Sequence, residues 1–170
     1  MLKEYAYTQR KSFVVAAALL LLWGTQTYAQ TPLTVDQGHD IVAPIYDALT
    51  DPSKKDIDGL LEQATTKDFQ SCSTNTDCVG RDAMVARFKE IGATIPDLHW
   101  SIKDIWVSGR YVFVRAQATG TPVRTFLGLP PNGKSFDTMS LDVYSTREGK
   151  IERSYHVENW IVALRQLGNK

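Results

Sequence analysis

His156 and Glu158 form the clearest chemical motif in the sequence, because only one residue separates them near the end of the chain. If both lie in an extended strand, their side chains share one face of it. A histidine with a carboxylate partner can move protons near neutral pH, since the carboxylate orients the ring and stabilises the imidazolium. In the alternative interpretation, the two residues brace the junction between a strand and a closing helix.

The two cysteines, Cys72 and Cys78, lie in the polar segment CSTNTDC. No histidine accompanies them and Asp77 is the only carboxylate between them, so a catalytic thiol or a metal pair is disfavoured. In an oxidising compartment, cysteines at this spacing most simply form a local disulfide. We expect this disulfide to lie in a loop outside any binding pocket. His39 and His99 are isolated, and the sequence predicts no metal site.

The composition is that of one ordinary globular domain. The chain has 170 residues, of which 43% are hydrophobic and 22% charged, which excludes a disordered chain. Lys and Arg together number 19, as do Asp and Glu. Without a basic excess, the sequence predicts no nucleic-acid partner. Nothing in it indicates a cofactor.

The N-terminus has the features of a targeting segment. Basic residues precede an apolar run from Phe13 to Trp23, which is shorter than the ~20 residues that span a bilayer as a helix. Thr27 and Ala29 then offer small residues before a cleavage site at Gln30. We therefore predict that residues 1–29 are a signal peptide and that the mature protein is exported, to the periplasm or the medium, with no stable membrane span. The alternative is an uncleaved membrane anchor.

The first part of the mature chain predicts three helices. Residues 30–39 are expected to be a leader, and the first helix is expected to start near Asp40, because Pro44 fits a helix only near its first turn. Apolar residues recur at helical spacing in the next segment, and Asp82 is a good cap for the third helix. The three helices are expected at about residues 40–49, 57–64 and 82–92.

Beyond Pro96 the period of the apolar residues changes to two, which is typical of strands. The segment before Arg147 carries Met139 and Leu141 on one face, with Ser140 and Asp142 on the other. The strands are expected at about residues 100–105, 111–119, 135–146 and 150–157, followed by a closing helix at 160–167. Helices followed by strands predict an α+β domain at residues 40–168, with the helices on one face of a curved antiparallel sheet.

A series of short motifs in the second half is similar to one known family. The motifs are Ile95–Leu98, Thr119–Pro122, Leu129–Phe136, Gly149–Ile151, Ser154–Trp160 and Ala163–Gly168. Their order and spacing resemble the SnoaL-like polyketide cyclases and ester cyclases, of the nuclear transport factor 2-like superfamily. The resemblance implies a cone-shaped fold, in which three N-terminal helices pack on a strongly bent antiparallel sheet around a pocket, with a short C-terminal helix.

The resemblance also implies a reaction and a set of catalytic residues. SnoaL-like cyclases close a ring by an intramolecular aldol step, in which an aspartate near the chain end removes a proton next to a carbonyl. The motif places Asn159 at that position, and a carboxamide cannot act as a general base. Relatives tend to carry a histidine where Tyr144 stands, and a phenol is a poor base near pH 7. We therefore expect His156 to be the base, oriented by Glu158, with Asn159 and Tyr144 as hydrogen-bond donors to the substrate.

The implied pocket is expected to be largely apolar with a few polar groups. Its candidate substrate-binding residues are Tyr144, Asp142, Trp106, Phe126 and Tyr155. The sequence thus favours an exported protein that binds a small apolar or carbonyl-containing molecule, for aldol-type cyclisation or isomerisation. Two other hypotheses stay open: a non-catalytic ligand-binding module, and a dimeric assembly module whose sheet pairs with a second copy.

Overall fold

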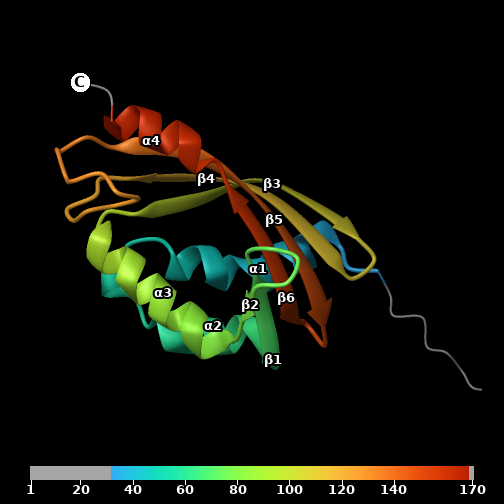
Figure 1. The fold of residues 1–170 in the computed structure, drawn as a ribbon. Coiled ribbons are helices and arrows are strands. Elements are labelled where there is room, and N and C mark those ends of the chain that lie inside the picture. Colours follow the sequence, from blue (N-terminus) through green and yellow to red (C-terminus); the bar gives the residue numbers. More distant parts are fainter. Residues whose placement is uncertain (1–31, 169–170) are drawn as a thin grey trace, which may run out of the picture.

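A six-stranded sheet and a layer of helices make up the fold (Figure 1). The computed structural model describes residues 32–168. The strand order is β2-β1-β6-β5-β4-β3. The elements in chain order are α1 (Val35–Ala48), a short 3-10 helix (Pro52–Lys54), α2 (Ile57–Ala64), β1 (Thr65–Cys72), β2 (Cys78–Val79), α3 (Arg81–Thr94), β3 (His99–Ser108), β4 (Tyr111–Gly120), β5 (Phe136–Arg147), β6 (Lys150–Glu158) and α4 (Trp160–Gly168).

The predicted α+β class and the three N-terminal helices are confirmed. Helices α1, α2 and α3 lie on one side of the sheet, and α4 packs against β5 at one end of it (Figure 1). The predicted signal peptide at residues 1–29 lies outside the described residues. One face of the sheet therefore turns toward the three helices, and the other, which we call the outer face, turns away from them.

The first helix begins earlier than the sequence suggested. Thr34 caps it, and the side chains of Thr34 and Gln37 accept hydrogen bonds from each other's backbone N–H groups in a capping box. Reciprocal bonds of this kind satisfy two of the N–H groups that a helix start leaves free. Helix α1 thus starts at Val35 rather than near Asp40, and Pro44 lies in its interior. Residues 35–39, which the sequence assigns to the leader, are helical and belong to α1.

The third helix also starts slightly earlier than expected. Gly80 is its N-cap residue, and Asp82 lies in its first turn instead of capping it. An acidic residue in this position still interacts favourably with the positive end of the helix dipole. The helix continues through Gly92 to Thr94.

The sheet contains two strands that the sequence does not predict, β1 and the two-residue strand β2, which pair antiparallel with each other. Strands β3 to β6 form the expected antiparallel meander. Strand β1, between α2 and α3, pairs parallel with β6, with a register shift between Thr65 and Gln70. The sheet is therefore mixed rather than wholly antiparallel. Because β1 continues the sheet beyond β6, it adds a wall next to the His156 strand.

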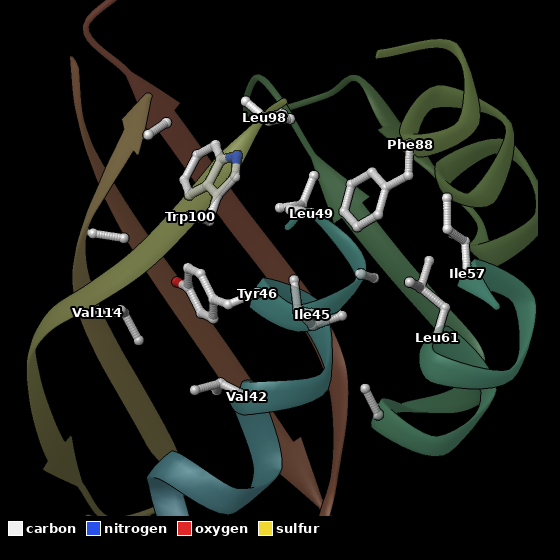
Figure 2. Packing of buried hydrophobic residues seen from close by; sticks show 14 of the residues in the cluster. Val42, Ile45, Tyr46, Leu49, Ile57, Leu61, Phe88, Leu98, Trp100 and Val114 are labelled. Carbon is white, nitrogen blue, oxygen red and sulfur yellow. The ribbon is translucent and has the colours of Figure 1, made fainter. Parts of the chain in front are cut away.

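The core lies between α1 and the sheet. Figure 2 shows Val42 and Tyr46 of α1 directed toward the strands, with Trp100 of β3 beside Tyr46. The Tyr46 and Trp100 ring centroids are 6.2 Å apart. Phe88 of α3 approaches Leu49 from the opposite side (Figure 2). All five side chains are at least nine-tenths buried, and burial of each such residue stabilises the fold by ~1.5–3 kcal/mol.

Candidate functional site

A cavity of about 180 Å³ lies between the helices and the inner face of the sheet. Side chains of α1 and α3, together with Phe69 and Trp100, give it mostly apolar walls. The apolar lining residues are Ile45, Leu49, Phe69, Met84, Phe88, Ile91 and Trp100. Such walls with a few polar groups are typical of small-molecule sites.

The polar groups come from the inner faces of two neighbouring strands. Asp142 and Tyr144 of β5 lie beside Ser154, His156 and Glu158 of β6. In the antiparallel register, Asp142 is opposite His156 and Tyr144 is opposite Ser154. Alternate residues of a strand point to the same face. Within each strand these residues are two positions apart, so all five side chains point to the cavity. The predicted placement of His156 and Glu158 on one side of the last strand agrees with this geometry.

Asp142 is held by several donors. Its Oδ2 accepts hydrogen bonds from the Tyr46 hydroxyl and the Ser140 hydroxyl, each at 3.0 Å. Its Oδ1 pairs with Nδ1 of His156. The Asp142 side chain is only 3% exposed. A buried carboxylate with this many partners is fixed in one orientation, so Asp142 in turn fixes the imidazole ring.

His156 lies between two carboxylates. Nδ1 pairs with Asp142, and Nε2 is 3.2 Å from Oε2 of Glu158. Burial lowers the pKa of the imidazole, but the hydrogen bonds and negative charges of Asp142 and Glu158 outweigh burial and raise the pKa from 6.5 to about 10. His156 is therefore an imidazolium at neutral pH. An imidazolium has no free lone pair, so in this state it cannot accept a proton.

Glu158 has one oxygen engaged and one free. Oε2 pairs with His156, whereas Oε1 is buried and has no hydrogen-bond partner among residues 32–168. The side chain is 7% exposed. Burial raises the pKa of the carboxyl above its ordinary 4.5, and the interactions with His156 and with the Trp160 side chain offset only part of that increase. A carboxylate with a raised pKa is a stronger base than an ordinary one.

The two tyrosines of the site form a hydrogen-bonded chain. The Tyr144 hydroxyl donates to the Tyr46 oxygen at 3.1 Å, and Tyr46 donates to Asp142. Burial raises the pKa of both phenols, so both stay protonated at neutral pH. Tyr144 lines the cavity as predicted, but its proton is directed to Tyr46. The expected hydrogen bond from Tyr144 to a substrate oxygen does not fit this arrangement.

Asn159, predicted to contact the substrate, lies outside the cavity. It follows the last residue of β6, where the chain leaves the strand and enters α4. Its backbone N–H donates to the Met139 carbonyl, and its own carbonyl accepts from the Thr138 hydroxyl. Its side chain is exposed and does not line the cavity. Asn159 is therefore not among the side chains that line this cavity.

Three predicted aromatic residues also lie elsewhere. Trp106 and Tyr155 are 53% and 42% exposed on the outer face of the sheet. Phe126 packs against Phe136 and Trp160, with ring centroids 6.0 and 5.1 Å away. The prediction that these three residues line the cavity is therefore wrong. Trp106 and Tyr155 lie on the outer face, and Phe126 packs against other aromatic side chains.

Other lining residues were not predicted. Tyr46 lies on the buried stripe of α1, and Trp100 lies near the start of β3. A buried tyrosine normally needs a partner for its hydroxyl, which is the feature of the sequence that could have identified Tyr46. Cys72 also lines the cavity. The Cys72–Cys78 disulfide is present as predicted, but the expectation that it lies away from the pocket is wrong.

Between residues 32 and 168, no helix is long and apolar enough to cross a membrane. In the same part of the chain, no three or more His, Cys, Asp or Glu side chains are arranged to hold a metal ion.

Solved structures share this architecture. A candidate SnoaL-like polyketide cyclase from Jannaschia sp. CCS1 superposes with a TM-score of 0.70 at 19% identity, covering 83% of this chain and 99% of the other. IdmH, a candidate polyketide cyclase from Streptomyces antibioticus, superposes with a TM-score of 0.69 at 25% identity, covering 78% of this chain and 99% of IdmH. A SnoaL-like polyketide cyclase from Agrobacterium tumefaciens C58 superposes with a TM-score of 0.64 at 22% identity, covering 77% of this chain and 98% of the other.

The sequence itself has no match among curated proteins. It does match the sequence profile of a family, and the match covers residues 41–167, which include the cavity and all its lining residues. The chain therefore belongs to the SnoaL-like polyketide cyclase family, whose fold is that of the nuclear transport factor 2-like superfamily.

Proposed function

We propose that this protein is an acid–base enzyme that removes a proton from the carbon next to a carbonyl group of a small ligand, with Glu158 as the base. One observation carries the proposal: Oε1 of Glu158 lies buried at the cavity without a hydrogen-bond partner in residues 32–168, while Oε2 is held by His156. A general base needs such a free, positioned oxygen.

The reaction would proceed in two steps. Glu158 takes the proton, and the electrons of the broken C–H bond form an enolate on the ligand. The enolate carbon then attacks a second carbonyl of the same ligand, and the resulting alkoxide takes the proton back from Glu158. This sequence is an aldol-type cyclisation. Return of the proton to a different carbon of the enolate would instead give an isomerisation.

His156 supports this chemistry as a positioning residue. Its imidazolium holds Oε2 of Glu158 and places a positive charge beside the region where the enolate develops negative charge. A fixed charge in a water-poor site stabilises such a transition state without reorganisation. The sequence-based assignment of His156 as the base is thus replaced by Glu158, with His156 oriented by Asp142.

Deuterium exchange tests the assignment without knowledge of the natural substrate. Acetophenone is a small methyl ketone. In D2O a base in the cavity should exchange its methyl protons for deuterium, and proton NMR measures the rate at which the methyl signal is lost. Glu158→Gln should slow this exchange by about 10²–10⁴-fold, the usual contribution of a general base. Glu62→Gln, at an exposed position of α2, is the matched control and should exchange like the wild type.

The competing function is a ligand-binding module without catalysis. The observation that favours it is the apolar wall of the cavity, which needs no reaction to be useful. If wild-type protein binds acetophenone but exchanges none of its methyl protons above the buffer rate, the binding module is the correct interpretation.

We also infer that residues 1–29 are removed on export. The Cys72–Cys78 disulfide supports this proposal, because such bonds persist mainly outside the reducing cytosol. Intact-mass measurement of protein recovered from the periplasm or medium should give a chain that starts at Gln30. A full-length chain extracted only with membranes would contradict it.

The outer face of the sheet supports a homodimer. A row of apolar side chains crosses four strands, because Trp106 of β3 is opposite Phe113 of β4, and Val143 of β5 lies between Phe113 and Tyr155 of β6. Val157 on the same face is 69% exposed. Contiguous exposed apolar side chains mark interaction surfaces. We propose that a second copy of the chain covers this face.

A further inference from the structure

We infer that the ligand is a compact oxo-carboxylate whose carbonyl oxygen accepts a hydrogen bond from the Trp100 indole and whose carboxylate pairs with Arg87 at the rim of the cavity. This inference rests on the proposed function, because it assumes that the cavity is the place where a carbonyl ligand reacts. It adds which groups bind the two ends of that ligand.

The indole nitrogen of Trp100 is a buried donor without an acceptor. Trp100 is 5% exposed, and its Nε1 has no hydrogen-bond partner in the described part of the chain. An indole N–H can only donate. Figure 2 shows this nitrogen on the edge of the ring that faces Leu49 and Phe88, which both line the cavity. A buried donor left unpaired is unfavourable, so a ligand oxygen in the cavity would relieve it.

The same oxygen would be close to the acid–base groups. The Trp100 ring centroid is 5.8 Å from that of His156, whose Nε2 holds Glu158. The Trp100 ring thus lies beside the imidazole that holds Glu158, and Trp100 and Glu158 line the same cavity. Donation by the indole N–H to the ligand carbonyl would also stabilise the enolate oxygen formed when Glu158 removes the neighbouring proton.

A second unpaired group lies on the same surface. The Ser154 hydroxyl is buried and lacks a hydrogen-bond partner within residues 32–168, and its strand neighbours are Tyr144 and Ser71. It lies four residues from Glu158 along β6, about 13 Å at ~3.3 Å per residue. A ligand that satisfied both Trp100 and Ser154 would need oxygen atoms at more than one place, which a purely apolar molecule lacks.

Arg87 supplies positive charge at the opening. It lines the cavity from α3 and is exposed. No acidic side chain of residues 32–168 pairs with Arg87, Arg124, Arg153 or Arg165, and of these four arginines Arg87 is the one that lines the cavity. A guanidinium recognises a carboxylate through two parallel hydrogen bonds. The cavity of about 180 Å³ is smaller than the ~300–1,000 Å³ of drug-sized sites, so the ligand is small.

Three matched probes test both contacts by calorimetry. They are 4-acetylbenzoate, its methyl ester, which removes the negative charge, and 4-isopropenylbenzoate, which replaces the ketone oxygen with a carbon. Wild-type protein should bind the ketone acid about three- to tenfold more tightly than the isopropenyl acid, the value of one hydrogen bond. It should bind the ketone acid about two- to fivefold more tightly than the ester, as expected for a partly exposed ion pair.

Two substitutions should separate the contacts. Trp100→Phe should abolish the preference for the ketone and keep the preference for the acid, and Arg87→Gln should do the reverse. Trp106→Phe and Arg165→Gln, on exposed residues outside the cavity, are the matched controls and should keep both preferences. If Trp100→Phe does not fold, the comparison of ketone and isopropenyl acids in wild-type protein still tests the hydrogen bond.

The inference is overturned if none of the three probes binds at millimolar concentration, if wild-type protein binds all three equally, or if both preferences survive both substitutions. Exchange of the acetyl protons of 4-acetylbenzoate in D2O separates this result from the proposed function. Binding with the expected preferences but without exchange would leave the ligand class intact and contradict proton abstraction. Exchange without either preference would contradict the ligand class alone.

Discussion

The charge of His156 links the catalytic site to the stability of the fold. Its imidazole is paired with Asp142 and Glu158 only in the folded chain. The folded protein therefore binds the imidazolium proton more tightly than the unfolded chain does, with a pKa of about 10 instead of 6.5. A group whose pKa is higher in the folded state than in the unfolded state stabilises the folded state at any pH at which the folded group holds its proton.

The stability that His156 contributes depends on pH. Below pH 6.5 the contribution of His156 is fully present, and it is lost as the pH rises from about 6.5 to about 10, because the unfolded chain then releases a proton that the folded one retains. The urea midpoint should fall across this range in wild-type protein. His156→Gln should flatten the fall, whereas His99→Gln, an exposed residue, should not. An unchanged slope in His156→Gln would contradict the ion pairs.

At the scale of single residues, strand periodicity was the most informative feature of the sequence. The spacing of His156 and Glu158 correctly predicts that they share a face. The aromatic residues Trp106 and Tyr155 were expected in the pocket but lie on the outer face, because hydrophobicity alone does not tell the two faces of this sheet apart. On the inner face of β5, the polar residues Asp142 and Tyr144 are buried and hydrogen-bonded to Tyr46, whereas Leu141 on the outer face is 51% exposed. Such a network depends on α1, which is distant in sequence.

At the scale of elements, β1 shows what sequence periodicity could not provide. The segment Thr65–Cys72 has the burial pattern of an irregular strand, with a register shift against β6. It contains one large apolar residue, Phe69, so no alternation of apolar and polar residues marks it. Its partner β6 is the last strand of the chain, and a parallel pairing with it cannot be inferred from neighbouring segments.

The disulfide holds the edge strand β2 to β1, and its removal should have two effects. In the chain-entropy model a short loop of this kind contributes about 2 kcal/mol, so Cys72→Ser/Cys78→Ser should lower the free energy of unfolding by about that amount in urea titrations. Because Cys72 also lines the cavity, the variant should bind acetophenone more weakly.

A reductant supplies the control for this experiment. It should destabilise wild-type protein to the level of the double serine variant and leave the variant unchanged. Equal stability of wild-type and variant proteins under oxidising conditions would show that the bond contributes nothing.

At the scale of the whole molecule, the two faces of β5 and β6 differ in what they present. The inner face of β5 and β6 presents polar side chains to the cavity, and the outer face presents apolar side chains to solvent. The large exposed residues on the outer face are Trp106, Tyr111, Phe113, Met139, Leu141, Tyr155 and Val157. Exposure of so many apolar groups is unfavourable in water. The proposed homodimer would bury them and leave the cavity, on the other side of the sheet, open to ligand.

Val157→Glu tests this dimer, because Val157 is 69% exposed on the outer face and a glutamate there would be buried without a partner in the interface. Burial of an unpaired charge should cost ~2 kcal/mol or more, about a thirtyfold increase in the dimer Kd. Sedimentation velocity over a concentration series should then show a dimer for wild-type protein and a shift to monomer for the variant. Val123→Glu, at a similarly exposed valine in the connection between β4 and β5, should stay dimeric. A wild-type protein that sediments as a monomer at every concentration would contradict the dimer. Exchange of the acetophenone methyl protons by the monomeric Val157→Glu variant would show that the cavity acts within one chain.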